Sequence, residues 1–271
     1  MTGSVRAIGW KAHAALVRNG GRWAALPGLG GSAYRLANGE PIWIGAGDVD
    51  MHPRTVVFDA PMVSTDRLCV AAIAPWRIAP LCLDDDEKRA LRDGGAALAA
   101  GVRNIGVARG FATLLAGQRP LFPLDPAIPQ VWKLATAIDR DDAQLACAAA
   151  LPLLGLGPGL TPSGDDLVGA ALFARRLLGM DAEWTSAAQR LIDAAPTRTH
   201  AISAALFRDL AEGQTFASLH RLAAVLAARE PALAAACELT GIGHSSGWDM
   251  LAGFIIGVSG SAGLRMHKDT V

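Results

Sequence analysis

The sequence predicts an α+β protein, because its hydrophobic pattern changes once along the chain, near residue 83. Before that point, short apolar runs alternate with glycine, proline and aspartate. Beyond it, apolar residues recur at the spacing of amphipathic helices. We therefore predict two domains: a β-rich N-terminal domain over residues 1–83 and a larger α-helical domain over residues 84–271, which carries the glycine-rich loops.

The N-terminal domain is expected to be a small, mostly antiparallel β-structure resembling a barrel. Asn38-Gly39 lies between two short apolar segments and predicts a hairpin turn, because both residues tolerate positive φ. The strand-length apolar runs are Gly21–Leu26, Pro41–Gly45, Arg54–Phe58, Leu68–Ile73 and Ile78–Leu83.

The helical domain is expected to begin at the acidic cluster Asp84–Glu87, because negative charge is favourable at a helix N-terminus. A metal site is the alternative interpretation of this cluster, but a solvated helix start is the more common use of such residues. Further helices are expected at about 104–117, 126–138, 141–152, 163–179, 184–194, 199–213, 215–229, 231–239 and 248–258.

Composition excludes several classes of protein. With 51% hydrophobic residues, 18% charged residues and a mean hydropathy of +0.29, the chain can bury a large core and is not intrinsically disordered. Its 25 basic and 25 acidic residues cancel, so neither nucleic acid nor an anionic membrane is an expected partner. We see no signal peptide and no uninterrupted apolar span, and therefore expect a cytoplasmic protein. The spacing of Cys69, Cys82, Cys147 and Cys237 argues against a zinc finger or a disulfide framework.

The most informative segment is the glycine-rich loop Gly155–Asp166, with the sequence GLGPGLTPSGDD. Glycines allow the backbone to approach a ligand closely, and the helix expected to follow offers free N–H groups to an anion. Ser163 is the expected N-cap, with Asp166 in the acidic position of a capping-box-like arrangement. Two aspartates do not suit a site for phosphate alone. They would fit a ligand that carries both an anionic group and N–H donors, or a Mg²⁺ ion that bridges to phosphate.

A second loop, Gly241–Gly253, repeats the pattern of glycines followed by Ser-Gly-x-Asp and an apolar helix. We infer that two helix N-termini converge on one ligand and are related by an internal duplication; two unrelated capped helices are the alternative. Gly243–Gly247 also matches the G-x-S-x-G elbow of α/β-hydrolases. We reject a serine hydrolase because a helix rather than a strand is expected before it, and because too little chain follows.

These loops, together with Thr199–Ser203, resemble the bacterial domain-of-unknown-function family that includes the H subunit of oxamate carbamoyltransferase, an enzyme of anaerobic allantoin breakdown. The loop motif G-x-G-x-G-L-T-P-S-G-D-D is the hallmark of that family, and T-x-x-I-S and G-H-x-S-G-x-D elements follow it. The resemblance implies carbamoyl transfer involving carbamoyl phosphate, oxamate and an oxalurate-type product. It also implies partner subunits, one of them similar to an acyl-CoA synthetase.

Such a transfer requires mainly orientation and stabilisation of charge, with general acid–base help. The candidate catalytic residues are Asp165, Asp166, His244 and Asp249. The sequence identifies no certain cofactor, and Mg²⁺ is a possible one. The alternatives are a non-catalytic assembly or regulatory subunit and a metal-dependent hydrolase. The candidate substrate-binding residues are Gly157, Gly159, Thr161, Ser163, Gly164, Thr199, Ser203, Ser245, Ser246 and Gly247.

Overall fold

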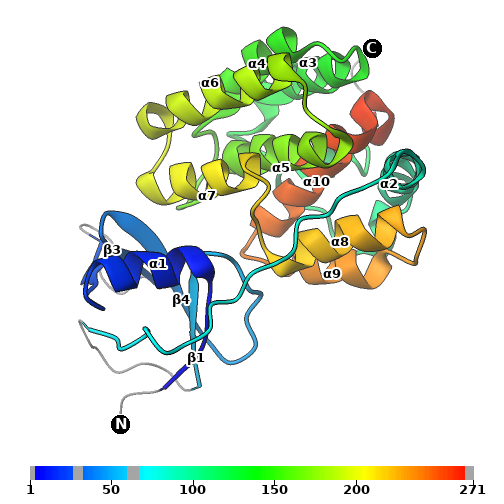
Figure 1. Cartoon of the computed structure of the whole chain (residues 1–271). Coiled ribbons are helices and arrows are strands. Elements are labelled where there is room, and N and C mark those ends of the chain that lie inside the picture. The colour runs from blue at the N-terminus through cyan, green and yellow to red at the C-terminus, as the bar shows by residue number, and fades with distance from the viewer. Residues whose placement is uncertain (1–3, 27–32, 60–66, 266–271) are drawn as a thin grey trace. The chain divides into compact units, whose positions relative to one another are not determined.

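The computed structural model describes residues 4–26, 33–59 and 67–265, and confirms the α+β class. The chain divides into two compact units. One contains residues 1–79 together with Thr215–Ala217, and the other contains residues 80–214 and 218–271. Figure 1 shows the strands in the first unit and most of the helices in the second.

The first unit is a five-stranded sheet with the order β1-β5-β4-β3-β2. All neighbouring strands are antiparallel except β4 and β5, which are parallel. The sheet is therefore mostly antiparallel, as expected, but it is mixed and open, so the expectation of a barrel-like domain is wrong. The strands are β1 (Val5–Ile8), β2 (Ala24–Ala25), β3 (Tyr34–Ala37), β4 (Glu40–Ala46) and β5 (Thr55–Phe58).

The predicted hairpin turn is confirmed, because Asn38 and Gly39 have φ of 52° and 77° and join β3 to β4. The expected strands at 68–73 and 78–83 are absent from the described residues. Residues 68–73 instead form a loop, held where Leu68 N donates to Gly21 O at 2.8 Å.

Helix α1 (Trp10–Arg18) was not expected. It buries Ala12, Ala15 and Leu16, which share one face at a spacing of three and four residues. These side chains join Ile8, Trp23, Ile42, Val56 and Phe58 in the core of this unit.

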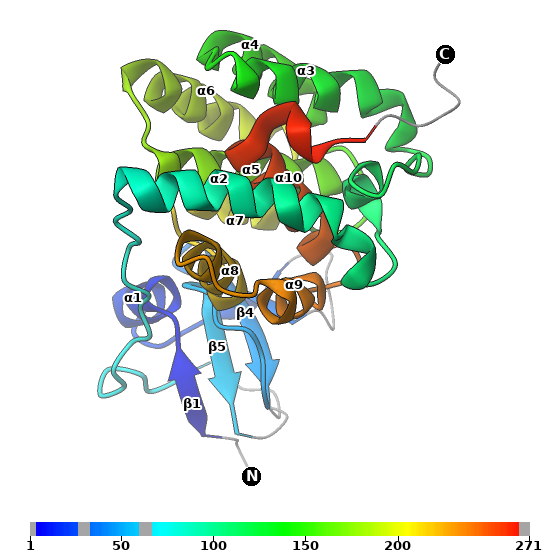
Figure 2. The same ribbon diagram turned by 90° about the vertical axis from the view of Figure 1, so that its right-hand side faces the viewer.

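The second unit is helical, and in Figures 1 and 2 its helices form three tiers, with α5 and α10 in the middle one. Because α10 buries nearly all of its side chains, it is apolar around its whole circumference, as expected for a central helix. The helices are α2 (Asp85–Ala100), α3 (Ile128–Asp139), α4 (Ala143–Ala150), α5 (Ser163–Leu178), α6 (Ala182–Arg198), α7 (Ala201–Ala211), α8 (Ala217–Ala227), α9 (Leu233–Thr240) and α10 (Ser246–Ser259). Short 3₁₀ turns are η1 (Val102–Asn104), η2 (Gly110–Leu114), η3 (Asp125–Ala127), η4 (Leu151–Leu153) and η5 (Gly260–Gly263).

The expected helix at 104–117 is wrong. The segment contains η1 and η2 separated by an irregular stretch, because Gly106 and Gly110 adopt φ of 153° and 54° and interrupt helical geometry.

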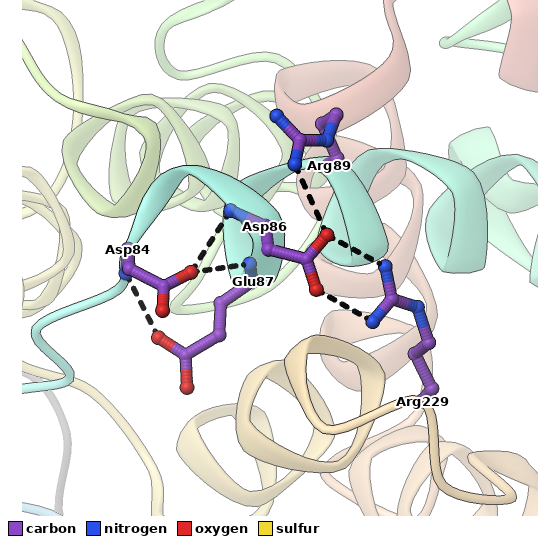
Figure 3. Close-up of polar contacts among 5 residues, drawn as sticks. All are labelled: Asp84, Asp86, Glu87, Arg89 and Arg229. Carbon is purple, nitrogen blue, oxygen red and sulfur yellow. Dashed lines mark hydrogen bonds and ion pairs between the residues drawn. The ribbon is translucent and has the colours of Figure 1, made fainter.

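The acidic cluster Asp84–Glu87 is a helix start, as the preferred interpretation predicted. Asp84 caps α2 by accepting from the N–H groups of Asp86 and Glu87, and Glu87 accepts in return from Asp84 N (Figure 3). Asp86 pairs with Arg229 and Arg89, which lower its pKa to about 2. The carboxylates of Asp84 and Glu87 therefore accept hydrogen bonds from the helix start, and that of Asp86 accepts from arginines. Asp85 Oδ1 lies 3.6 Å from Lys88 Nζ.

A buried histidine on α8 makes the helical unit sensitive to acid. His220 is 4% exposed, neither ring nitrogen has a hydrogen-bond partner, and the ring packs edge-on against Phe173 at 5.0 Å. Burial lowers its pKa to about 4, from about 6.5 in an unfolded chain. The unfolded chain therefore binds the proton more tightly, and stability falls as pH drops from about 6.5 towards about 4.

We expect His220→Leu to remove about 2 kcal/mol of the stability difference between pH 7.5 and pH 5.0. Urea denaturation at the two pH values measures this difference, and His200→Gln, a change at an exposed histidine, is the matched control. Equal pH dependence in wild type and His220→Leu would contradict the assignment.

Candidate functional site

The first turns of α5 and α10 lie together at one end of the helical unit. A Cβ at Gly253 would collide with Leu167 O, and one at Gly257 would collide with Ala171 O. Both pairs advance by four residues, so the two helices run parallel and are packed closely enough to require glycine on α10. Their N-termini, which carry the positive ends of two helix dipoles, therefore point in the same direction.

The two first turns are built alike. Gly164 and Gly247 each occupy the second position of their helix. A Cβ at either would collide with a backbone carbonyl oxygen, of Leu153 and Leu239 respectively. These glycines are therefore needed for packing of the turn against the preceding segment. This similarity supports the predicted duplication, which stays a prediction.

The loop before α5 turns through three glycines, Gly155, Gly157 and Gly159, with φ of 79°, 121° and 96°. The expected N-cap was wrong by one residue. Pro162 occupies the cap position, and its carbonyl accepts from the N–H groups of Asp165 and Asp166 at 2.9 and 3.2 Å. Ser163 is the first helical residue, and its hydroxyl forms a hydrogen bond with Asp249.

Asp165 fastens three segments to one another. Its Oδ1 accepts from Gly155 N at 2.8 Å, and its Oδ2 accepts from the hydroxyls of Thr199 and Ser203, the latter at 2.6 Å. The carboxylate is 2% exposed, so these donors take the place of water. The Thr199–Ser203 element thus supports the glycine-rich loop through Asp165.

Asp166 and Asp249 form a buried carboxyl pair. They are 6% and 0% exposed, and one oxygen of each lacks a hydrogen-bond partner. Burial, and then the charge of Asp249, raise the pKa of Asp166 well above its usual range, while the Ser246 hydroxyl opposes the shift. Burial also raises the pKa of Asp249 to about 7, against the opposing effects of Phe111 N and the hydroxyls of Ser163 and Ser245.

Hydroxyl groups connect the two loops above this carboxyl pair. Thr161 Oγ1 and Ser246 Oγ lie 2.9 Å apart, and both side chains are partly exposed. Ser246 also lies near Asp166, and Ser163 and Ser245 lie near Asp249. Hydroxyls from both loops therefore lie close to the two carboxyls.

Sequence reasoning missed the segment at the start of η2, from Arg109 to Phe111. Phe111 N donates to Asp249 Oδ1 at 2.7 Å, and a Cβ at Gly110 would collide with the same carboxylate. Arg109, which is exposed, donates to His244 O at 2.9 Å and lies 3.4 Å from His244 Nδ1. An arginine flanked by glycines, in GVARG, was the available signal, and the expectation of a regular helix there concealed it.

The structure therefore gathers most of the predicted site residues at one place. Asp166, Asp249, Ser163, Ser245 and Ser246 lie around the two helix starts. His244 lies at the exposed rim, and Thr199 and Ser203 lie behind the loop, bound to Asp165. Within the described ranges, no group of three or more His, Cys, Asp or Glu side chains could hold a metal ion. The possible role of Mg²⁺ stays a prediction.

Comparison with known proteins gives one match. Residues 153–258 match a family model described as "Oxamate carbamoyltransferase subunit AllH". This match supports the family predicted from the motifs. No curated protein and no solved structure matches the chain.

The AllH match begins in η4 and ends in α10, and so includes both glycine-rich loops and the Thr199–Ser203 element. Arg109 and residues 1–79 of the sheet unit lie outside it. The AllH description refers to a subunit of a carbamoyltransferase, which supports this class and a multi-subunit enzyme. Among the residues described, no helix has the length and apolar character needed to cross a membrane.

Proposed function

We propose that this chain is a subunit of a carbamoyltransferase that binds a small phosphate or carboxylate substrate at the N-termini of α5 and α10. The observation that carries the proposal is the parallel packing of these helices. It brings the positive ends of two helix dipoles together inside the segment that matches AllH. Carbamoyl phosphate, oxamate and oxalurate are the proposed ligands.

The contacts suggest distinct roles for the four candidate catalytic residues. Asp165 has its carboxylate occupied by three donors of the chain, which favours a positioning role. Asp166 and Asp249 have oxygens without partners beneath the hydroxyls, which favours acid–base work. His244 lies at the rim beside Arg109, where a ligand would enter.

Arg109 is the proposed source of positive charge for the ligand. Neither loop contains a lysine or arginine, so backbone N–H groups and hydroxyls alone would face an anion there. A guanidinium at the rim adds charge-assisted hydrogen bonds, each worth about 1.5–3 kcal/mol.

We expect carbamoyl phosphate or oxamate to raise the melting temperature of the purified full chain, because a ligand at 100 times its Kd adds about 2.7 kcal/mol of stability. Arg109→Gln should weaken binding by about tenfold or more without unfolding the protein. Arg119→Gln is the matched control, since Arg119 is also exposed and pairs with Asp125. Titrations with phosphate and oxalurate, with and without Mg²⁺, identify the preferred ligand.

A non-catalytic role in assembly is the second candidate, and one observation favours it. Val107, Leu121 and Phe122 are 83–85% exposed, which is unusual for large apolar side chains. On this view the chain docks a partner subunit, for which a protein similar to an acyl-CoA synthetase is proposed. Absence of a thermal shift with every ligand, in wild type as in Arg109→Gln, would support assembly and overturn the ligand site.

A further inference from the structure

The proposed site contains an apparent conflict, because an anion and two carboxyl groups meet at the same helix starts. Asp166 and Asp249 lie in the first turns of α5 and α10, where the proposed ligand binds. Two ionised carboxylates there would repel a phosphate or carboxylate, and burial leaves little water to screen the repulsion.

The surroundings of the two carboxyl groups favour a neutral form. Asp166 Oδ2 and Asp249 Oδ2 are both buried without a donor, and an ionised carboxylate in such a place loses its hydration without replacement. Asp165, in contrast, is equally buried but accepts from three donors. The chain therefore supplies donors to both oxygens of Asp165 but leaves one oxygen of Asp166 without a donor.

Each member of the pair is reached from the opposite loop. The Ser246 hydroxyl, from the α10 loop, lies near Asp166, and the Ser163 hydroxyl, from α5, lies near Asp249. The Ser246 hydroxyl also meets Thr161 Oγ1 at 2.9 Å. These hydroxyls can donate or accept, so they can connect a protonated carboxyl to a ligand at the surface.

We propose that the site takes up a proton together with its anionic ligand, and that this proton resides on the Asp166–Asp249 carboxyl pair beneath the two helix N-termini. The inference rests on the proposed function, since it needs an anion at these N-termini. Binding of the anion disfavours negative charge on the pair, so a carboxylate that is ionised in the free protein becomes protonated. The pair then donates towards the ligand instead of repelling it.

A test of this proposal must distinguish proton uptake by the carboxyl pair from uptake by other ionisable groups on the surrounding elements. Helices α2 and α3 approach α10 near Val258 and Gly260, away from its N-terminus. Glu238 on α9 pairs with Arg221. The groups nearest to the site or on elements packed against the two N-terminal turns are Asp165, Arg109, His244, Arg198, His200, Arg208, Asp209 and Glu238. Of the histidines, His244 is the one at the rim, so it is the main competitor for the proton.

Isothermal titration calorimetry of the full chain tests the proposal, with oxamate and sulfate as probes because neither titrates between pH 6.5 and 8.5. Titration in buffers of different ionisation enthalpy gives the number of protons taken up. We expect uptake of up to one proton per anion and a Kd that rises by up to about tenfold per pH unit above neutrality. Asp249→Asn should abolish the uptake and flatten the pH dependence while still binding the anion, because asparagine is neutral at every pH.

His244→Gln is the matched control, and it should keep the proton uptake whatever it does to the affinity. Anion binding without proton uptake in wild type would overturn this inference and leave the proposed function intact. Uptake that disappears in His244→Gln and persists in Asp249→Asn would also overturn it, as would binding that requires added Mg²⁺. Absence of binding by either probe at every pH would overturn the inference together with the proposed anion site.

Discussion

Asp165→Ala is expected to lower the free energy of unfolding by about 3–5 kcal/mol, because it leaves several buried donors without an acceptor. Gly155 N, Thr199 Oγ1 and Ser203 Oγ all donate to this one carboxylate. Loss of these hydrogen bonds would detach the start of the glycine-rich loop from α7 and from Thr199, which follows the end of α6. Urea denaturation monitored by circular dichroism measures the change.

Two further variants define the cause of this loss. Asp165→Asn keeps one acceptor oxygen in nearly the same shape, so we expect it to retain part of the stability that alanine loses. Asp193→Ala, on the exposed surface of α6, should change stability by less than about 0.5 kcal/mol. A loss of the same small size in Asp165→Ala would show that the three hydrogen bonds do not hold the loop.

Asp249→Asn is expected to have the opposite effect and to stabilise the protein at alkaline pH. Burial raises the pKa of Asp249 to about 7, against about 3.9 in an unfolded chain. The stability that protonation supplies is complete below the unfolded pKa and is lost as pH rises through the folded one. Asparagine carries no charge, so the stabilisation by this variant should be about 3 kcal/mol greater at pH 8.5 than at pH 5.0.

The same denaturation experiment at the two pH values measures this difference. Asp193→Asn is the control, because its side chain is exposed and its neutralisation should be nearly independent of pH. A stabilisation by Asp249→Asn that does not grow with pH would contradict the effect of burial on the pKa of this carboxyl. We therefore expect Asp165→Ala to destabilise the protein and Asp249→Asn to stabilise it at alkaline pH, although both aspartates are buried in one site.

The structure explains which parts of the fold could be predicted from sequence. Long helices such as α5 and α6 and the Asn38-Gly39 hairpin were foreseen, because local spacing and turn chemistry decide them. The helix α1 and the parallel pairing of β4 with β5 were not foreseen. The apolar pattern of α1 is short, and short strands are compatible with several pairings. A helix was wrongly expected at residues 104–117 because their apolar spacing is helical. Two glycines in this segment take φ values that a helix does not allow.

For the candidate site, the sequence by itself determined the two loops, their aspartates and hydroxyls, and the family that the AllH match supports. Tertiary structure decided what each residue does. Asp165 and Asp166 are neighbours of the same type, yet one receives three donors and the other leaves an oxygen without any. Arg109 and Phe111 N reach the second loop from more than a hundred residues away. Hydrogen-bond partners and burial depend on segments distant along the chain, so local sequence cannot specify them.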